Sequence, residues 1–276
     1  MFRPEISLQD CCIRKYNSNT PQSFSADPNY KFLKQFEEFH LSRDNGINGF
    51  NAYLRSIKAV FNKAIKENII SPEYYPFRDY KIKQKKTIKR AITKEEMQKI
   101  VDLDLEKESY LRHARNYFLF SFSTIEMSWV DMALLKPEDI HNDRIIYRRS
   151  KTHKEYNIKI NNQIKEILEY YLNMNNTYIF PIIKKDDELD KRNDIKNRLR
   201  RYNENLKRIG KKIKSSIPLT SYVARHSWAS IANFSGVHIG IISQGLGHED
   251  IKTTQTYLAN FDYSDIDSAN ENILQQ

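Results

Sequence analysis

The chain alternates between segments of helical period and short segments of alternating period. Near the N-terminus, apolar residues recur at three- and four-residue steps over residues 30–39 and 50–65. Further helical stripes cover residues 93–103, 110–122, 128–135, 164–172 and 195–209. Residues 140–160 instead alternate apolar and polar positions in three short runs separated by turns. We therefore predict a mainly α protein with a small three-stranded antiparallel sheet in its larger, C-terminal part.

Changes in this pattern predict the domain boundaries. Residues 1–27 have no period and are rich in Ser and Asn, so we expect an irregular leader followed by a small all-α domain over residues 28–78. Residues 79–90 are crowded with Lys and lack an apolar stripe, which predicts a basic linker. The next helix opens with the capping-box sequence Thr93-Lys94-Glu95-Glu96, and a mostly helical second domain is expected over residues 91–276.

The net charge of the chain indicates what kind of partner it binds. Lys and Arg (45) outnumber Asp and Glu (35), so the 276 residues carry a net charge of +10, which favours a polyanion such as nucleic acid. No apolar run approaches the roughly 18 residues of a membrane span, and the start, Met1 to Glu5, has no signal-peptide apolar region. The adjacent Cys11 and Cys12 fit neither a disulfide framework nor a CxxC metal site. We expect a soluble, cytoplasmic protein without a membrane partner.

An ordered set of residues in the C-terminal part suits phosphate chemistry. Arg225 lies in LTSYVARHSWAS, and His248 and Tyr257 lie in QGLGHEDIKTTQTYL. An arginine grips two phosphate oxygens with a planar fork, and a histidine donates to a third oxygen or moves a proton. Beside such a cationic cradle, a tyrosine can attack phosphorus covalently. The set predicts phosphoryl transfer through a phosphotyrosine, with no metal and no nucleotide cofactor.

This set resembles the C-terminal signature of the tyrosine-type site-specific recombinases, the phage-integrase family. Arg225 matches the second family arginine and His226 the residue after it. His248 matches the histidine of Leu-Gly-His, and Tyr257 matches the nucleophile. Lys151 matches the family's hairpin lysine, and the resemblance implies that it is the general acid toward the leaving 5′ oxygen. As an ordered set these matches are specific, although each motif is weak alone.

The resemblance extends to the N-terminal domain and implies how the protein works. Residues 50–76 look like the last part of the helical core-binding domain of Bacteroides-type members. The family fold implies a C-shaped clamp on double-stranded DNA with specific core sites, and a homotetramer on DNA assembled from solution monomers. It also implies a bacterial, nucleoid-associated protein of a mobile element. The residues expected to bind DNA are Arg55, Lys58, Lys63, Lys83, Lys85, Lys86 and His226.

The sequence departs from the family pattern at two positions. Tyr222 stands where the family has the histidine of His-x-x-Arg; a tyrosine can still hydrogen-bond a phosphate oxygen. Ser128 stands where the family has its first arginine. We expect Arg149 to replace that arginine, because residues two apart on a strand share a face, so that Arg149 would point with Lys151 if the strand reaches that far. Arg148 and Lys154 are the other candidates.

Some of these residues also have structural explanations that involve no catalysis. Ser128-x-x-Asp131 has the spacing of a helix cap, which would explain Ser128 without chemistry. His226 is more readily a hydrogen-bonded support than a phosphate ligand, and the basic residues of 196–214 suit either DNA contact or a solvated surface. Two other functions stay open. One is a type IB-like topoisomerase that acts on a single duplex, and the other is a catalytically impaired relative that only binds DNA.

Overall fold

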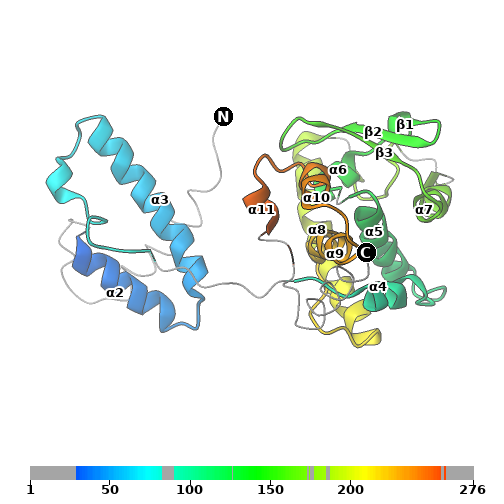
Figure 1. Cartoon of the computed structure of the whole chain (residues 1–276), viewed down its shortest axis with the longest axis horizontal. Helices are drawn as coiled ribbons and strands as arrows, with labels where there is room; N and C mark the ends of the chain where they lie inside the picture. The colour runs from blue at the N-terminus through cyan, green and yellow to red at the C-terminus, as the bar shows by residue number, and fades with distance from the viewer. Residues whose placement is uncertain are drawn as a thin grey trace, which may run out of the picture. The chain divides into compact units, whose positions relative to one another are not determined.

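A computed structural model describes residues 29–82, 90–125, 127–172, 174, 177–184, 187–255 and 258 of the chain. The chain divides into two compact units, Met1–Ile88 and Lys89–Gln276 (Figure 1). The described part is mainly helical and contains one three-stranded antiparallel sheet, so the predicted fold class is confirmed. Within the described residues, no helix combines the length and the apolar character needed to cross a bilayer.

The first unit is a small helical unit built on two amphipathic helices, α2 (Tyr30–Leu41) and α3 (Ile47–Lys66), followed by the short helix η1 (Pro72–Tyr74). The side chain of Asn29 caps α2 by accepting a hydrogen bond from the backbone N–H of Phe32. The apolar stripes of α2 and α3 meet in a core whose fully buried members are Leu33, Phe36, Phe50 and Leu54. The helical period seen in residues 30–39 and 50–65 therefore marks the faces that the two helices bury.

The first unit extends further along the chain than the predicted boundary at residue 78. Phe77 and Tyr80 are buried in its core, and Ile82 packs against them. The Tyr80 hydroxyl donates to a carboxylate oxygen of Glu37, itself buried, at 2.7 Å. Residues 79–82 thus belong to this unit rather than to a linker. The sequence pattern did not indicate this, because Tyr80 and Ile82 stand among basic residues and two apolar positions alone do not make a helical stripe. Residues 83–89, and with them Lys83, Lys85 and Lys86, lie outside the described residues.

The second unit carries the remaining described elements. Its helix α4 (Lys94–Val101) begins with the predicted capping box, in which Thr93 and Glu96 bond each other's backbone N–H. The elements that follow are α5 (Ser109–Ser123), α6 (Trp129–Leu134), η2 (Pro137–Asp139), β1 (Ile140–His141), β2 (Arg144–Arg148), β3 (Glu155–Lys159), α7 (Asn162–Leu172), α8 (Glu188–Lys212), α9 (Val223–Phe234), α10 (Ile239–Gly245) and α11 (Ile251–Gln255). The helix predicted over residues 195–209 is thus longer at both ends.

Helix α5 lies at the centre of this unit and packs against α7, α8 and α9. It is buried on several sides, and Phe118 and Phe120 have no exposed surface. The rings of Tyr117 on α5, Tyr171 on α7 and Phe180 pack against one another, at distances between ring centroids of 4.9 to 5.9 Å. A rigid central helix of this kind fixes the C-terminal end of α5, where the candidate site begins.

The sheet is a meander in the order β1-β2-β3. Ile145 pairs with Ile158, both are buried, and the residues between alternate outward, as the period-two pattern predicts. Strand β2 ends at Arg148, which leaves Arg149 and Lys151 in the connection to β3. The predicted sharing of one strand face required the strand to reach these residues, and that condition is not met.

A second, smaller cluster of buried residues holds the C-terminal helices together. Ala229 of α9 packs with Ile242 and Leu246, and Trp228 lies against this cluster. Gly245 ends α10 and faces the Trp228 ring so closely that a Cβ there would lie 3.1 Å from it. The turn after α10, which contains His248, is in this way held against the helix that carries Arg225.

Candidate functional site

A cavity of about 310 Å³ in the second unit is lined by residues of several elements far apart in the sequence. Four of the predicted catalytic residues line it together: Arg149, Lys151, Tyr222 and Arg225. Ser128, at the position of the family's first arginine, lines it as well. The remaining lining residues are Ser121, Met127, Trp129, Met132, Tyr202 and Ser221. This convergence makes the cavity the candidate active site.

Arg225 is the third residue of α9 and is 6% exposed. Its Nη2 atom donates to the carbonyl oxygen of Leu246 at 3.2 Å and lies 2.6 Å from Nε2 of His248. A buried guanidinium is costly unless its donors are bonded, and the turn after α10 supplies these acceptors. The turn therefore fixes the direction in which Arg225 points.

His248 is held between two partners, one at each ring nitrogen. An arginine has donors but no acceptor, so Nε2 must offer its lone pair to Arg225. A neutral ring then carries its proton on Nδ1, which lies 2.9 Å from the Thr254 hydroxyl. Burial, and then the positive charges of Arg225 and Arg149, lower the pKa of His248 from 6.5 to about 4. At neutral pH the ring is uncharged and Nε2 is a proton acceptor.

Ser128 caps helix α6 as its spacing to Asp131 predicted. Its hydroxyl accepts from the Asp131 backbone N–H at 3.2 Å and donates to the Asp131 carboxylate at 2.7 Å. The cap interpretation is confirmed, and this side chain supplies no positive charge to the cavity.

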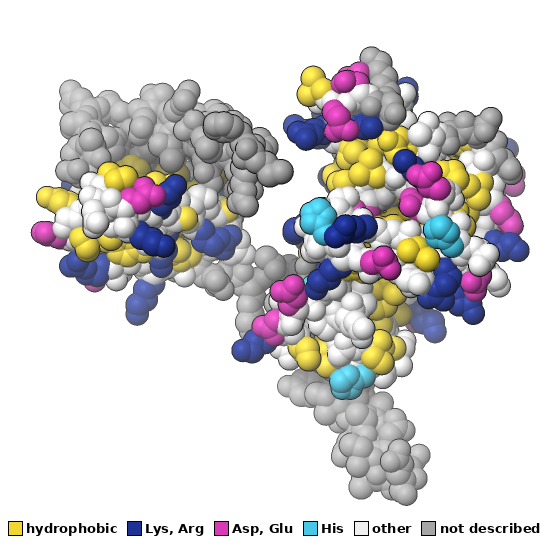
Figure 2. Space-filling view, turned by 90° about the horizontal axis from the view of Figure 1, so that it is seen from above, with side chains coloured by type: hydrophobic (Ala, Val, Ile, Leu, Met, Phe, Trp, Pro, Cys, Tyr) yellow, Lys and Arg dark blue, Asp and Glu magenta, His cyan; other side chains and the backbone are white. Residues whose placement is uncertain are grey.

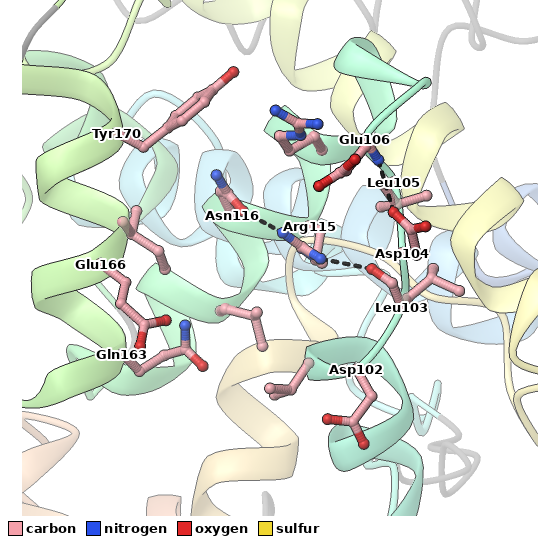
Figure 3. Close-up of a pocket in the computed structure, with 14 residues that line it drawn as sticks. Asp102, Leu103, Asp104, Leu105, Glu106, Arg115, Asn116, Gln163, Glu166 and Tyr170 are labelled. Atoms are coloured by element: carbon pink, nitrogen blue, oxygen red, sulfur yellow. Dashed lines mark hydrogen bonds between the residues drawn. The ribbon is translucent and has the colours of Figure 1, made fainter.

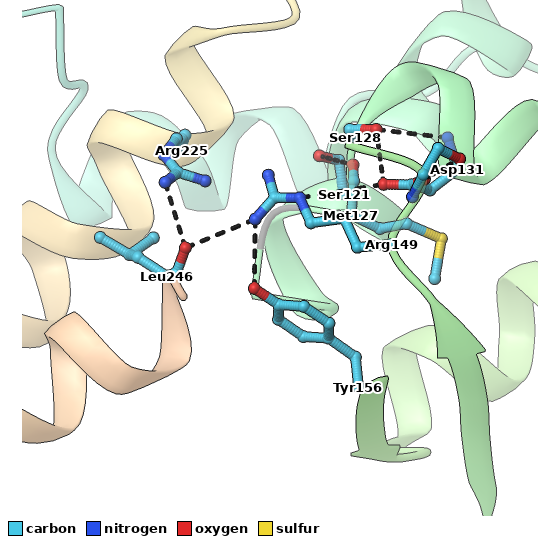
Figure 4. Close-up of polar contacts among 9 residues, drawn as sticks. Ser121, Met127, Ser128, Asp131, Arg149, Tyr156, Arg225 and Leu246 are labelled. Atoms are coloured by element: carbon cyan, nitrogen blue, oxygen red, sulfur yellow. Dashed lines mark hydrogen bonds and ion pairs between the residues drawn. The ribbon is translucent and has the colours of Figure 1, made fainter. Parts of the chain in front are cut away.

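Arg149 brings a guanidinium to the same cavity from the hairpin (Figure 4). Its Nη1 atom donates to the Tyr156 hydroxyl at 3.1 Å and to the Leu246 carbonyl oxygen at 3.4 Å. Its Nε lies 4.0 Å from the buried carboxylate of Asp131. Arg149 and Arg225 thus point at one backbone oxygen, which is the arrangement expected of two cations that share one anionic ligand.

Asp131 fixes the start of the hairpin turn. Its Oδ1 accepts from both the backbone N–H and the hydroxyl of Ser150, at 2.8 and 2.6 Å. The turn is closed by the Arg149 N–H bonding the Lys154 carbonyl and the His153 N–H bonding the Arg149 carbonyl. Arg149 is therefore positioned by the tertiary contact of Ser150 with Asp131, which strand alternation could not predict.

The other predicted residues of the site are more exposed. Lys151 is exposed at the cavity rim, as a lysine that reaches for an incoming ligand would be. Tyr222 is 44% exposed, and its ring meets the half-buried His226 ring edge-on at 4.9 Å. Among the described residues that line this cavity, His226 is absent, and its role stays a prediction. Tyr257 lies outside the described residues, two positions beyond the end of α11.

Three of the predicted DNA-binding residues, Arg55, Lys58 and Lys63, lie on α3 of the first unit. Arg55 and Lys63 are exposed, and Lys58 is half-buried. Lys63 pairs with Glu67 at 3.7 Å. On the face shown in Figure 2, Lys and Arg side chains are scattered over each unit among hydrophobic ones.

Three residues that contact the candidate site residues or position them escaped the sequence interpretation: Asp131, Tyr156 and Thr254. Asp131 carried a signal, the cap spacing from Ser128, which pointed to local structure only. Tyr156 and Thr254 are ordinary residues of a strand and a short helix, and only the fold brings them to Arg149 and His248. No pattern in the sequence could have found these two.

A cavity of about 440 Å³ elsewhere in the second unit suits phosphate poorly (Figure 3). It contains Arg112 and Arg115, and Arg115 is already bonded to the Leu103 carbonyl and to Asn116. The carboxylates of Asp102, Asp104, Glu106 and Glu166 surround these arginines and would repel an anion. The described residues also contain no cluster of three or more His, Cys, Asp or Glu arranged to hold a metal ion.

The second unit matches the family model described as the phage integrase family over residues 90–263, which is more than half of the 276 residues. The chain belongs to the phage integrase family. A second model, the phage integrase SAM-like domain, matches residues 12–88. The resemblance inferred from Arg225, His248 and Tyr257 is thereby confirmed at the level of the family. The more specific likeness to Bacteroides-type members stays a prediction.

Two curated relatives in the phage integrase family are tyrosine recombinases XerA. That of Saccharolobus solfataricus is 33% identical over 125 residues, which cover 45% of this chain and 38% of the relative. That of Pyrococcus horikoshii is 28% identical over 179 residues, which cover 62% of this chain and 57% of the relative. The chain spans less than two thirds of the length of either relative.

Solved integrase structures share the fold of this family member. A Tn1549 transposon integrase in complex with circular intermediate DNA has a TM-score of 0.70 at 14% identity, covering 97% of this chain and 94% of that one. A lambda integrase dimer bound to a core site has a TM-score of 0.67 at 16% identity, covering 93% and 89%. At these identities the likeness concerns the fold.

Proposed function

We propose that this phage integrase family member is a site-specific recombinase that cleaves and rejoins double-stranded DNA through a covalent 3′-phosphotyrosine on Tyr257. The observation that carries the proposal is the meeting of Arg149 and Arg225 at one oxygen, the Leu246 carbonyl, in a cavity that Lys151 and Tyr222 also line. Family membership and the solved DNA complexes of similar fold support the same function.

The guanidinium groups of Arg149 and Arg225 now donate to a neutral carbonyl oxygen and could donate to a charged phosphate oxygen instead. A phosphate oxygen carries negative charge, and hydrogen bonds between ionised groups are roughly twice as strong as neutral ones. A scissile phosphate in the cavity would therefore replace the Leu246 carbonyl as the ligand of Arg149 and Arg225. Fixed donors of this kind also stabilise the charge that develops on the phosphate oxygens during attack.

The bond changes follow from the protonation states. The Tyr257 oxygen attacks phosphorus, the bond from phosphorus to the 5′ oxygen breaks, and Lys151 gives that oxygen its proton. Once Arg225 turns to the phosphate, Nε2 of neutral His248 accepts the Tyr257 proton. The reverse steps rejoin the strand. The phosphodiester energy is kept in the tyrosine ester, so no ATP and no metal is required.

A duplex that carries a nick near the cleavage position tests the enzymatic proposal. Loss of the short fragment traps the protein on the DNA, and we expect a covalent adduct on denaturing gels with wild type and none with Tyr257→Phe. No Tyr257-dependent adduct at any tested site would contradict the proposal and favour a protein that only binds DNA. Adduct without recombination between two sites would favour the topoisomerase alternative.

We propose further that Arg149 takes the place of the family's first arginine. In support, Arg149 lines the cavity, whereas Arg148 is exposed and donates to the His153 carbonyl. Lys154 bonds the Gly247 carbonyl and Glu249 instead. Removing one preorganised donor to a transition-state oxyanion slows catalysis by about 10² to 10³-fold.

The matched test compares Arg149→Ala with Arg148→Ala in single-turnover cleavage of the nicked duplex. We expect the first variant to lose about two to three orders of magnitude in rate and the second to cleave like wild type. Equal rates for Arg149→Ala and wild type would rule out the substitution.

The wider assembly follows from the same proposal. Arg55, Lys58 and Lys63 on α3, together with Lys83, Lys85, Lys86 and His226, are expected to contact DNA at specific core sites. Monomers in solution would assemble as a homotetramer on two sites, in bacterial cells at the nucleoid. Mass photometry with and without a two-site DNA tests this, and a tetramer that forms without DNA would contradict it.

A further inference from the structure

Thr254 is a fully buried polar residue of α11 that no part of the proposed reaction uses. Its hydroxyl lies 2.9 Å from Nδ1 of His248, and its side chain has no exposed surface. Helix α11 packs against α10, the helix that leads into the His248 turn. The contact therefore joins the last described helix to the histidine of the candidate site.

The direction of this hydrogen bond is fixed by Arg225. Because Arg225 only donates, Nε2 of His248 accepts and the proton of the neutral ring is on Nδ1. The Thr254 hydroxyl must then accept from Nδ1–H. Thr254 is the acceptor for this Nδ1–H, and the bond opposes a ring flip, which would turn carbon atoms toward Arg225 and Thr254.

We propose that Thr254 is a positioning residue of the site: its hydroxyl holds the His248 ring with Nε2 directed at Arg225, and holds α11 against His248. Thr254 precedes Tyr257 by three residues, so the same bond fixes the helix that leads to the nucleophile. This inference rests on the proposed function, because it assigns Thr254 a role in the cleavage step.

The competing explanation is that Thr254 fills space between α10 and α11. Two variants separate the explanations. Thr254→Val keeps the branched shape and removes the acceptor, and Thr254→Ser keeps the hydroxyl and removes a methyl group. A space-filling role predicts that Val is tolerated and Ser is harmful, whereas a positioning role predicts the reverse.

The first measurement needs no DNA. Nitrogen-15 NMR of histidine-labelled protein distinguishes a protonated from an unprotonated ring nitrogen, and His248→Gln assigns the resonances. We expect the Nδ1–H tautomer in all three proteins, because Arg225 holds Nε2 as the acceptor, and a changed Nδ1–H resonance in Thr254→Val alone, because that proton has lost its acceptor. An unchanged His248 signature in Thr254→Val would overturn the proposal.

The second measurement is single-turnover cleavage of the nicked duplex, with DNA affinity measured by fluorescence anisotropy. A misdirected proton acceptor should slow Thr254→Val by about tenfold or more with unchanged DNA affinity, and Thr254→Ser should restore the rate. Rates that follow the thermal stability of the variants rather than the presence of the hydroxyl would overturn the proposal. If wild type forms no adduct, the proposed function fails, while the NMR measurement still decides the role of Thr254.

Discussion

Gly247, between Leu246 and His248, is required by both its backbone and its surroundings. Its φ is +70°, a conformation that side chains disfavour, and a Cβ would collide with the Tyr156 hydroxyl. Gly236 is the matched control, since its φ is +78° but nothing lies within 4 Å of a Cβ. The contact with Tyr156 means that the turn after α10 and strand β3 fit each other only with glycine at this position.

We predict that Gly247→Ala destabilises the protein more than Gly236→Ala does. Gly236→Ala should cost about 1–2 kcal/mol of unfolding free energy from the left-handed backbone alone. Gly247→Ala should cost more, and adding Tyr156→Phe should recover part of the excess by removing the hydroxyl. Urea unfolding measures all three, and equal costs for the two alanine variants would show that Tyr156 does not constrain the turn.

His248 makes stability depend on acidity. Its pKa is lowered in the folded protein, from 6.5 to about 4, so the unfolded chain binds the proton more tightly. The stability that the neutral ring contributes is complete above pH 6.5 and is lost as the pH falls toward 4. We predict a steeper fall in melting temperature over this window for wild type than for His248→Gln. Parallel curves would contradict a lowered pKa.

At the scale of single residues, the sequence predicted the groups to which we assign chemistry but missed the residues that hold them in place. Arg225 and His248 were found because an ordered motif marks them, and the structure brings them into contact. The acceptors Thr254 and Tyr156 were missed because their roles come from neighbours distant in sequence. Tyr257, the predicted nucleophile, lies outside the described residues, so its role stays a prediction.

At the scale of the helices and strands, the start of α4 is stabilised both by a local capping box and by a contact with a residue distant in the sequence. Glu96 completes the capping box with Thr93, and its carboxylate also accepts from the backbone N–H of Ser216 at 2.6 Å. Burial alone would raise the pKa of Glu96, but the hydrogen bonds from Ser216 and Thr93 outweigh burial and lower it. The carboxylate thus contributes stability above pH 4.5 that is lost as the pH falls below it.

We predict that Glu96→Ala is more harmful than Thr93→Ala. Loss of the Thr93 cap should cost about 1 kcal/mol. Loss of Glu96 also leaves the Ser216 N–H without its acceptor, which adds about 1–3 kcal/mol. Urea unfolding at pH 7 gives both values. A smaller cost for Glu96→Ala would mean that the bond to Ser216 contributes little.

The hairpin shows which features of a structural element an alternating sequence pattern can predict and which it cannot. Alternation predicted the three strands and their order, because each strand buries one face. Strand β2 ends at Arg148, shortly before Ser150, whose backbone N–H and hydroxyl Asp131 binds. The same contact, and not strand geometry, delivers Arg149 to the cavity.

For the whole molecule, composition predicted a polyanion partner and the change of pattern predicted two domains. The chain does form two compact units, and Tyr80 extends the first of them beyond the expected boundary. The sequence alone does not distinguish Tyr80, which lies among basic residues, from a linker residue. The distinction comes from its contact with Glu37 in the fold.

The charge on α3 gives a prediction at this scale. If exposed Arg55 contacts a phosphate, Arg55→Ala should weaken DNA binding and reduce the slope of log affinity against log salt by about 1. Lys165→Ala is the matched control, because Lys165 is exposed in the second unit and pairs with Glu169. Anisotropy titrations at several salt concentrations measure the slopes. Equal slopes for the two variants would remove Arg55 from the DNA interface.

The cap formed by Ser128 has a consequence for any arginine placed at that position. Ser128→Arg would remove the cap of α6 and bring a second guanidinium to the carboxylate that Arg149 approaches. The Ser128 cap and an arginine at the same position therefore exclude each other locally.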